Sequence, residues 1–208
     1  MPIPFTDNFS SYVAGGLNGQ GPWSTFRLTD GGAGAGSDMQ VTAGAQVQCP
    51  LNINGGAGVA LCSYAVAHQS LTVSIDIITY AGVCGPALLT SSSTGAGATI
   101  IFGAYNTGTG KFQIASGRGM TDISGYTTLA SQAHAAPTTP YTLTLRSNNT
   151  KLQLLLNGVD VCRVRDQYPG GLRVNAGGFT DGSNGSVFDN FALDNYHDEG
   201  WFSGSVNA

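Results

Sequence analysis

Residues 140–166 read PYTLTLRSNNTKLQLLLNGVDVCRVRD, and this stretch decides the fold class. From residue 140 to 147 leucines alternate with threonines, which is the period of a strand with one buried face. The segment SNNT (147–150) and the dipeptide Asn157-Gly158 are turn signals, because Asn and Gly tolerate the positive φ that tight hairpins require. The stretch therefore predicts a three-stranded antiparallel meander.

The same period of two recurs outside the meander, most clearly in SLTVSIDIITY (70–80), where every second residue is aliphatic. No stretch keeps helical spacing of apolar residues for three turns. Many short strands in a chain of 208 residues predict an all-β fold: one antiparallel two-sheet sandwich over residues 1–197, with a tail at 198–208. We expect the further strands at 23–29, 45–49, 59–66, 99–106, 111–116 and 173–179.

Charged residues make up 10% of the chain, whereas about 25% is typical. The net charge is −4 and the cations are scattered along the sequence, so neither nucleic acid nor an anionic membrane is an expected partner. The segment MPIPFTDNFSSY (1–12) lacks the basic and apolar regions of a secretion signal. We therefore expect synthesis in a cytoplasm, with secretion as the alternative.

A family resemblance rests on the two ends of the chain. Asp-Asn-Phe occurs near both ends. The segments YTLTLRSNNTKLQLLLNGVDVCRVRD (141–166) and GGLRVNAGGFTDGSNGSVFDNFALDN (170–195) resemble the closing half of concanavalin A-like (laminin G-like) jelly-roll domains, and TDNFSSY (6–12) resembles their first strand. The resemblance implies a jelly-roll sandwich in which the first and last strands are neighbours, which places Asp7 near Asp189. It also suggests a structural calcium site at this pair. The alternative is that both carboxylates cap turns.

The chain lacks the catalytic pattern of the hydrolases in this superfamily. Those enzymes hold two carboxyl groups on one strand as Glu-x-Asp-x-x-Glu or Glu-x-Asp-x-Glu, whereas this chain has one glutamate, Glu199. No Gly-x-Ser-x-Gly elbow is present either. We therefore expect no catalytic residues, no enzymatic activity and no required cofactor.

Four cysteines, Cys49, Cys62, Cys84 and Cys162, lack the close spacing of zinc or redox motifs. We expect buried thiols, with a bridge between Cys49 and Cys62 as the alternative.

Two functions agree with these observations. The few charges, the richness in Gly, Ala, Ser and Thr, and an aromatic tail resemble phage virion surface proteins. The first hypothesis is therefore a non-catalytic capsid decoration or fibre protein on a virion surface, homo-oligomeric and docked on a protein lattice. The alternative is a carbohydrate-binding module or a glycoside hydrolase-like protein. We expect Trp23 in the core, and contacts to a ligand or partner from Tyr126, Tyr168, Trp201 and Phe202.

Overall fold

The computed structural model describes residues 4–27, 39–49, 58–62, 70–91, 98–118, 126–165, 172–182 and 185–195. These residues form strands, turns and loops, and no helix lies among them. No helix in this part of the chain is thus long and apolar enough to cross a membrane.

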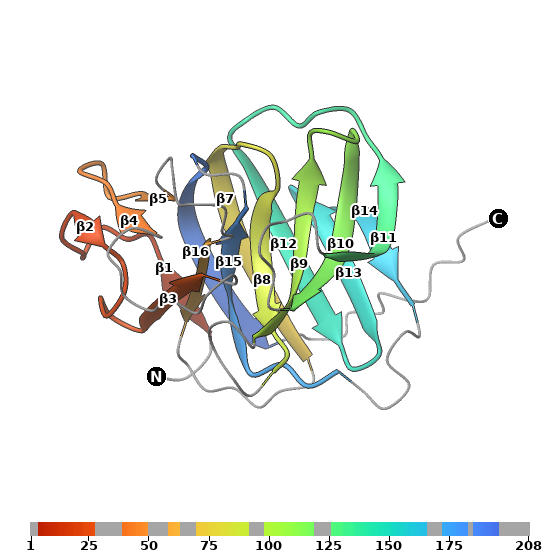
Figure 1. The fold of residues 1–208 in the computed structure, drawn as a ribbon, viewed down its shortest axis with the longest axis horizontal. Coiled ribbons are helices and arrows are strands. Elements are labelled where there is room, and N and C mark those ends of the chain that lie inside the picture. The colour runs from red at the N-terminus through yellow and green to blue at the C-terminus, as the bar shows by residue number, and fades with distance from the viewer. Residues whose placement is uncertain are drawn as a thin grey trace.

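The strands form two antiparallel sheets that pack face to face (Figure 1). Sheet A has the order β14 (Val159–Val164), β13 (Lys151–Leu156), β12 (Tyr141–Asn148), β7 (Ser70–Thr79), β16 (Val187–Asn195), β5 (Val47–Gln48), β4 (Gln40–Val41) and β2 (Gly15–Gly16), and β1 (Phe5–Asp7) also pairs with β16. Sheet B has the order β11 (Thr127–Ala133), β10 (Lys111–Arg118), β9 (Thr99–Asn106), β8 (Cys84–Leu89), β15 (Ala176–Asp181), β6 (Gly58–Cys62) and β3 (Trp23–Arg27). The predicted two-sheet sandwich is confirmed, and so is the meander, which is β12, β13 and β14.

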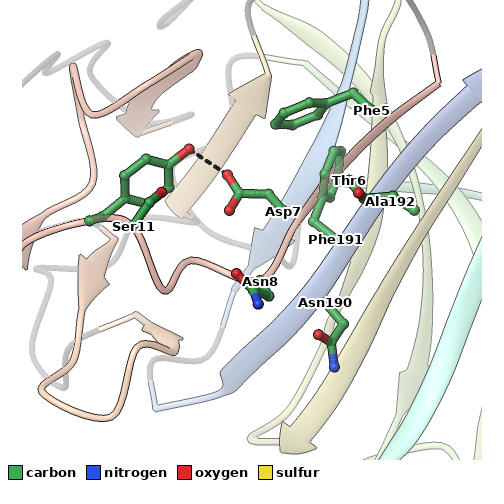
Figure 2. A pocket seen from close by; sticks show the side chains of 9 residues that line it. Phe5, Thr6, Asp7, Asn8, Ser11, Asn190, Phe191 and Ala192 are labelled. Atoms are coloured by element: carbon green, nitrogen blue, oxygen red, sulfur yellow. Dashed lines mark hydrogen bonds between the residues drawn. The ribbon is translucent and has the colours of Figure 1, made fainter.

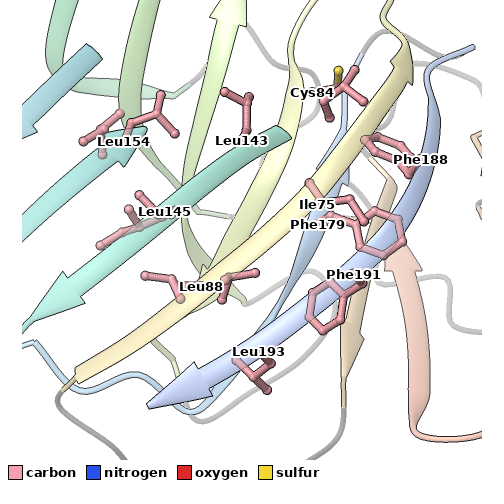
Figure 3. Packing of buried hydrophobic residues seen from close by; sticks show 14 of the residues in the cluster. Ile75, Cys84, Leu88, Leu143, Leu145, Leu154, Phe179, Phe188, Phe191 and Leu193 are labelled. Atoms are coloured by element: carbon pink, nitrogen blue, oxygen red, sulfur yellow. The ribbon is translucent and has the colours of Figure 1, made fainter. Parts of the chain in front are cut away.

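The core lies between the sheets and follows from strand alternation (Figure 3). In β7, Leu71, Val73, Ile75 and Ile77 are fully buried, and the residues between them are partly exposed. Each such side chain contributes about 1.5–3 kcal/mol through burial. Trp23 is 2% exposed and belongs to this core, as predicted.

Two glycines of sheet B lie directly under side chains of sheet A. A Cβ at Gly103 in β9 would lie 2.3 Å from the Leu154 Cδ1 of β13. A Cβ at Gly177 in β15 would lie 2.6 Å from the Leu193 Cδ1 and 2.8 Å from the Val73 Cγ2. The branched side chains of sheet A therefore occupy the space that a side chain at either glycine would need.

Four strands were not predicted: the two-residue strands β2 and β4, and the longer strands β8 and β11. β8 contains Pro86, and proline normally argues against a central strand because it lacks an N–H. Here the β8–β9 ladder covers only Ala87 to Leu89, so Pro86 lies outside it. β11 is exposed along most of its length and shows no alternation to read. The predicted strand at 173–179 is also displaced, since β15 runs from Ala176 to Asp181.

The cysteines are consistent with buried thiols where their side chains are described. Cys84 and Cys162 are free and buried. Burial, with a smaller contribution from the charge of Asp181, raises the pKa of Cys84 to about 12. Cys49 is buried as well, but the side chain of Cys62 lies outside the described part of the chain, so a Cys49–Cys62 bridge stays a prediction.

Candidate functional site

The two Asp-Asn-Phe segments of the sequence meet on one edge of sheet A. β1 pairs antiparallel with β16, with Phe5 opposite Leu193, Thr6 opposite Ala192, and Asp7 opposite Phe191. This pairing of the first and last strands is as the sequence predicted. The segments thus overlap head to tail, so that the aspartate of one motif faces the phenylalanine of the other.

Asp7 connects the two sheets through its carboxylate. Its Oδ2 accepts hydrogen bonds from the Tyr12 hydroxyl (2.5 Å) and from the Trp23 Nε1 (2.8 Å), and its Oδ1 accepts one from the Phe9 backbone N–H (2.8 Å). Because Trp23 lies in β3 of sheet B, the indole N–H would have no such acceptor without β1. Asp7 therefore satisfies a buried donor and fixes the edge of the sandwich.

The chain turns sharply directly after β1. The side-chain oxygens of Asp7 and Asn8 each accept a bond from the backbone N–H two residues on, which is the local turn chemistry of Asp and Asn. Phe9 has φ of 58°, a left-handed value that is unfavourable for an aromatic residue. It is fully buried, and its ring packs 5.6 Å from Trp23 and 6.1 Å from Phe179. Burial of the ring offsets the backbone strain and holds Asn8 at the surface.

A β-bulge in β16 forms the other side of the site. Asn190 has φ of 48°, and the register with β7 shifts between Asp189 and Ala192. The Asn190 Nδ2 donates to the Asp76 Oδ2 (2.9 Å), and the Thr142 hydroxyl donates to the Asp76 Oδ1 (2.5 Å). These hydrogen bonds to Asp76, on the outer face of sheet A, fix the orientation of the Asn190 amide.

Between these two features lies a pocket of about 570 Å³, which we call the DNF pocket (Figure 2). Its polar rim comes from Thr6, Asn8, Ser11 and Asn190, which are exposed, together with Asp7. Within the described chain, the Asn8 Nδ2, the Asn190 Oδ1 and the hydroxyls of Thr6 and Ser11 have no hydrogen-bond partner. The remaining lining residues are Phe5, Tyr12, Phe191 and Ala192.

The surroundings of Asp7 do not fit a calcium ion. Three donors converge on its carboxylate, whereas a calcium site presents only oxygen acceptors. Asp189 lies opposite Asp76, and its Oδ1 accepts from the Asn190 backbone N–H. No group of three or more His, Cys, Asp or Glu side chains is placed to hold a metal among the residues described above. Calcium at Asp7 and Asp189 remains a prediction with no supporting geometry.

The predicted aromatic contacts lie elsewhere. Tyr126 is on the outer face of sheet B, where its ring is 5.4 Å from that of Phe102 and its hydroxyl accepts from the Asn106 Nδ2 (2.9 Å). Tyr168, Trp201 and Phe202 lie outside the described residues. Sequence reasoning weighted the aspartates of the repeated motif and missed the asparagines, although Asn tolerates left-handed φ better than most residues.

Comparison with known proteins identifies the fold. No family model and no curated protein sequence matches the chain. Among solved structures it is similar to lectin II from Ulex europaeus, with a TM-score of 0.61 and 10% identity over 92% of this chain and 97% of the lectin. It is also similar to the carbohydrate-binding module CBM66 from Bacillus subtilis, with a TM-score of 0.59 and 12% identity over 86% of this chain and 99% of the module. The calcium- and mannose-bound exoplasmic domain of VIP36 matches with a TM-score of 0.57 and 9% identity over 84% of this chain and 83% of that domain. The chain therefore has the concanavalin A-like jelly-roll fold, as its sequence predicted.

Proposed function

We propose that this protein is a non-catalytic glycan-binding module whose ligand occupies the DNF pocket. The observation that carries the proposal is the set of unpaired groups on the pocket rim. The Asn8 amide offers a donor, the Asn190 Oδ1 offers an acceptor, and Thr6 and Ser11 offer hydroxyls that do both. Sugar hydroxyls also donate and accept, so a row of such groups is complementary to a sugar edge.

Aromatic residues complete the complementarity. Phe5 and Tyr12 line the same pocket and are only partly buried. The apolar face of a sugar ring packs well against an aromatic ring, while polar side chains bind its hydroxyls. The fold agrees with this function, since a carbohydrate-binding module and a lectin share it.

A binding role fits the pocket better than hydrolysis. Glycoside hydrolysis needs one carboxyl group on each side of the scissile bond, and the described residues of the lining contribute a single carboxylate, Asp7. Three hydrogen bonds already engage that carboxylate. Display on a virion, docking on a protein lattice and homo-oligomerisation remain predictions.

The test is a glycan array followed by titration calorimetry on the full chain. Thr6→Val removes one rim hydroxyl from an exposed strand position, and Asn190→Gly removes the rim amide while keeping a residue that tolerates the left-handed backbone. Each variant should weaken binding of the array hit by about tenfold. The matched control is Thr128→Val, at an exposed position of β11, and it should leave affinity unchanged. Saturable binding that neither pocket variant weakens would disprove the assignment of this pocket.

A further inference from the structure

Half of the basic residues of this chain gather on one face of sheet A. Arg146, Lys151, Arg163 and Arg165 are four of eight Lys and Arg residues in a chain whose net charge is −4. They come from β12, from β13, from β14 and from the position after β14, and these strands are adjacent. The alternate residues of these strands are in the core, so the basic side chains project from the outer face.

Strand register aligns two of these arginines on either side of a glutamine. Arg146 lies opposite Gln153, and Gln153 lies opposite Arg163. Residues directly opposite in antiparallel strands project from the same face, and neighbouring strands are about 4.8 Å apart. The Cα atoms of the two arginines are therefore about 10 Å apart, with Gln153 between them. We call these three residues the arginine row.

Asp160 holds two members of the row in place. Its Oδ2 accepts hydrogen bonds from the Gln153 Nε2 and from the Arg163 Nε. The side chains of Arg163 and Asp160 are 28% and 23% exposed. An arginine fixed through Nε keeps its terminal nitrogens for a second partner, and a fixed guanidinium binds a carboxylate with little loss of side-chain entropy.

The row also contains two buried polar atoms without partners. Gln153 is 2% exposed, and its Oε1 has no hydrogen bond. The Arg146 Nε is buried and lacks an acceptor within the described part of the chain. Native proteins rarely leave such atoms unpaired, because each costs about 1–3 kcal/mol. Both atoms are closed to solvent, so a ligand group reaches them only after the two side chains shift apart. One hydroxyl group then satisfies both, since it accepts from an N–H and donates to a carbonyl oxygen.

A groove of about 550 Å³ lies beside this row. It is lined by Gln132, Asp160, Val161, Cys162, Arg163 and Arg165. Among the lining residues that belong to the described chain, Asp160 is the one carboxylate, and it is paired with Arg163. The groove shares Arg163 with the row, and its described lining contains two arginines and one carboxylate.

We infer that the arginine row binds a uronic acid unit of an acidic glycan. The sugar carboxylate pairs with the terminal nitrogens of Arg163, and a neighbouring hydroxyl bridges the Arg146 Nε and the Gln153 Oε1. A neutral sugar satisfies only the second of these contacts, so the charge of the row selects the acidic one. This site is formed by different strands from the DNF pocket and does not depend on it.

The experiment titrates the full chain with trigalacturonic acid and with its methyl ester, which has a similar shape and no charge. We expect the acid to bind at least about tenfold more tightly than the ester. Arg146→Gln and Arg163→Gln should each lower the affinity for the acid by about tenfold. The control Lys111→Gln makes the same charge change at an exposed site of sheet B and should change affinity less than about twofold.

A measurement on the unmodified protein guards against variants that fold poorly. The side-chain amide resonance of Gln153 should shift when the acid is added and stay in place when inorganic sulfate is added. Equal binding of acid and ester would overturn the inference. An equal loss of affinity in Lys111→Gln would also overturn it, because that result means general charge attraction. So would a Gln153 amide resonance that does not shift in protein saturated with the acid. Binding of neutral glycans at the DNF pocket is measured with Thr6→Val, so either site can fail alone.

Discussion

Replacing Asp7 by alanine tests whether this carboxylate connects the sheets through hydrogen bonds. The change removes the acceptor of three donors, and one of them, the Nε1 of Trp23, belongs to a side chain that is 2% exposed. Bonds to a charged acceptor contribute about 1.5–3 kcal/mol, and a buried donor left unpaired costs about 1–3 kcal/mol. We expect Asp7→Ala to lower the free energy of unfolding by about 3–5 kcal/mol, or the melting temperature by about 6–20 °C.

Urea unfolding of a double-mutant cycle with Tyr12→Phe separates the contribution of one bond. We expect a coupling energy between Asp7 and Tyr12 of about 1–2 kcal/mol. The control is Asp194→Ala, because within the described residues the Asp194 Oδ1 accepts one bond, from the neighbouring N–H of Asn195. Its cost should be about 0.5 kcal/mol. A loss below about 1 kcal/mol in Asp7→Ala would refute the reasoning. The reasoning would also be refuted if a metal chelator lowered the stability of the wild-type protein as much as Asp7→Ala does. That result would mean that the carboxylate acts through a bound metal.

Three further predictions concern packing, pH and assembly. Gly103→Ala should destabilise the protein by about 1–3 kcal/mol in urea unfolding through contact with Leu154. The same change should cost less in a Leu154→Ala background, where the contact is absent. Gly44→Ala, whose Cβ meets nothing closer than 3.7 Å, should be neutral. Folding raises the pKa of Cys84 from 9.0 to about 12, so the thiol ionises at lower pH in the unfolded chain than in the folded one. The free energy of unfolding should therefore fall as pH rises from 9.0 to about 12. In urea unfolding at alkaline pH, Cys84→Ala should make this fall smaller. Deleting residues 198–208 should reduce the mass measured by light scattering from an oligomer to a monomer, and an unchanged mass would remove the tail as the contact.

The sequence predicted the parts of the fold in which one face of a strand is buried. β7 and β12 alternate cleanly because one face of each contacts the core and the other faces outward. The Asn-Gly turn at 157–158 fixed the register of the meander, and both residues have positive φ. β11 was missed because it is exposed on both faces and therefore has no pattern.

Of the site residues predicted from the sequence, only Asp7 is among the described residues that line the DNF pocket. The resemblance of residues 6–12 and 170–195 to the first and closing strands of jelly-roll domains correctly indicated that β1 and β16 are neighbours. In a regular strand Asp189 and Phe191 would share a face. The bulge at Asn190 changes this, so that Phe191 is in the core while Asp189 lies opposite Asp76. One inserted residue leaves no signal in the hydrophobic pattern, and the surroundings of the two aspartates differ for that reason.

The antiparallel pairing of β1 with β16 has a mechanical consequence. Phe5, at the start of β1, lies opposite Leu193, near the end of β16. A force that pulls the start of β1 away from the end of β16 therefore loads the hydrogen bonds between the two strands one after another. Bonds loaded in sequence yield at lower force than bonds sheared together. β1 would therefore peel away first, taking Asp7 from Trp23 and opening the DNF pocket while the remaining strands stay paired. A protein anchored through both ends would thus lose the DNF pocket under strain before the rest of the sandwich unfolds.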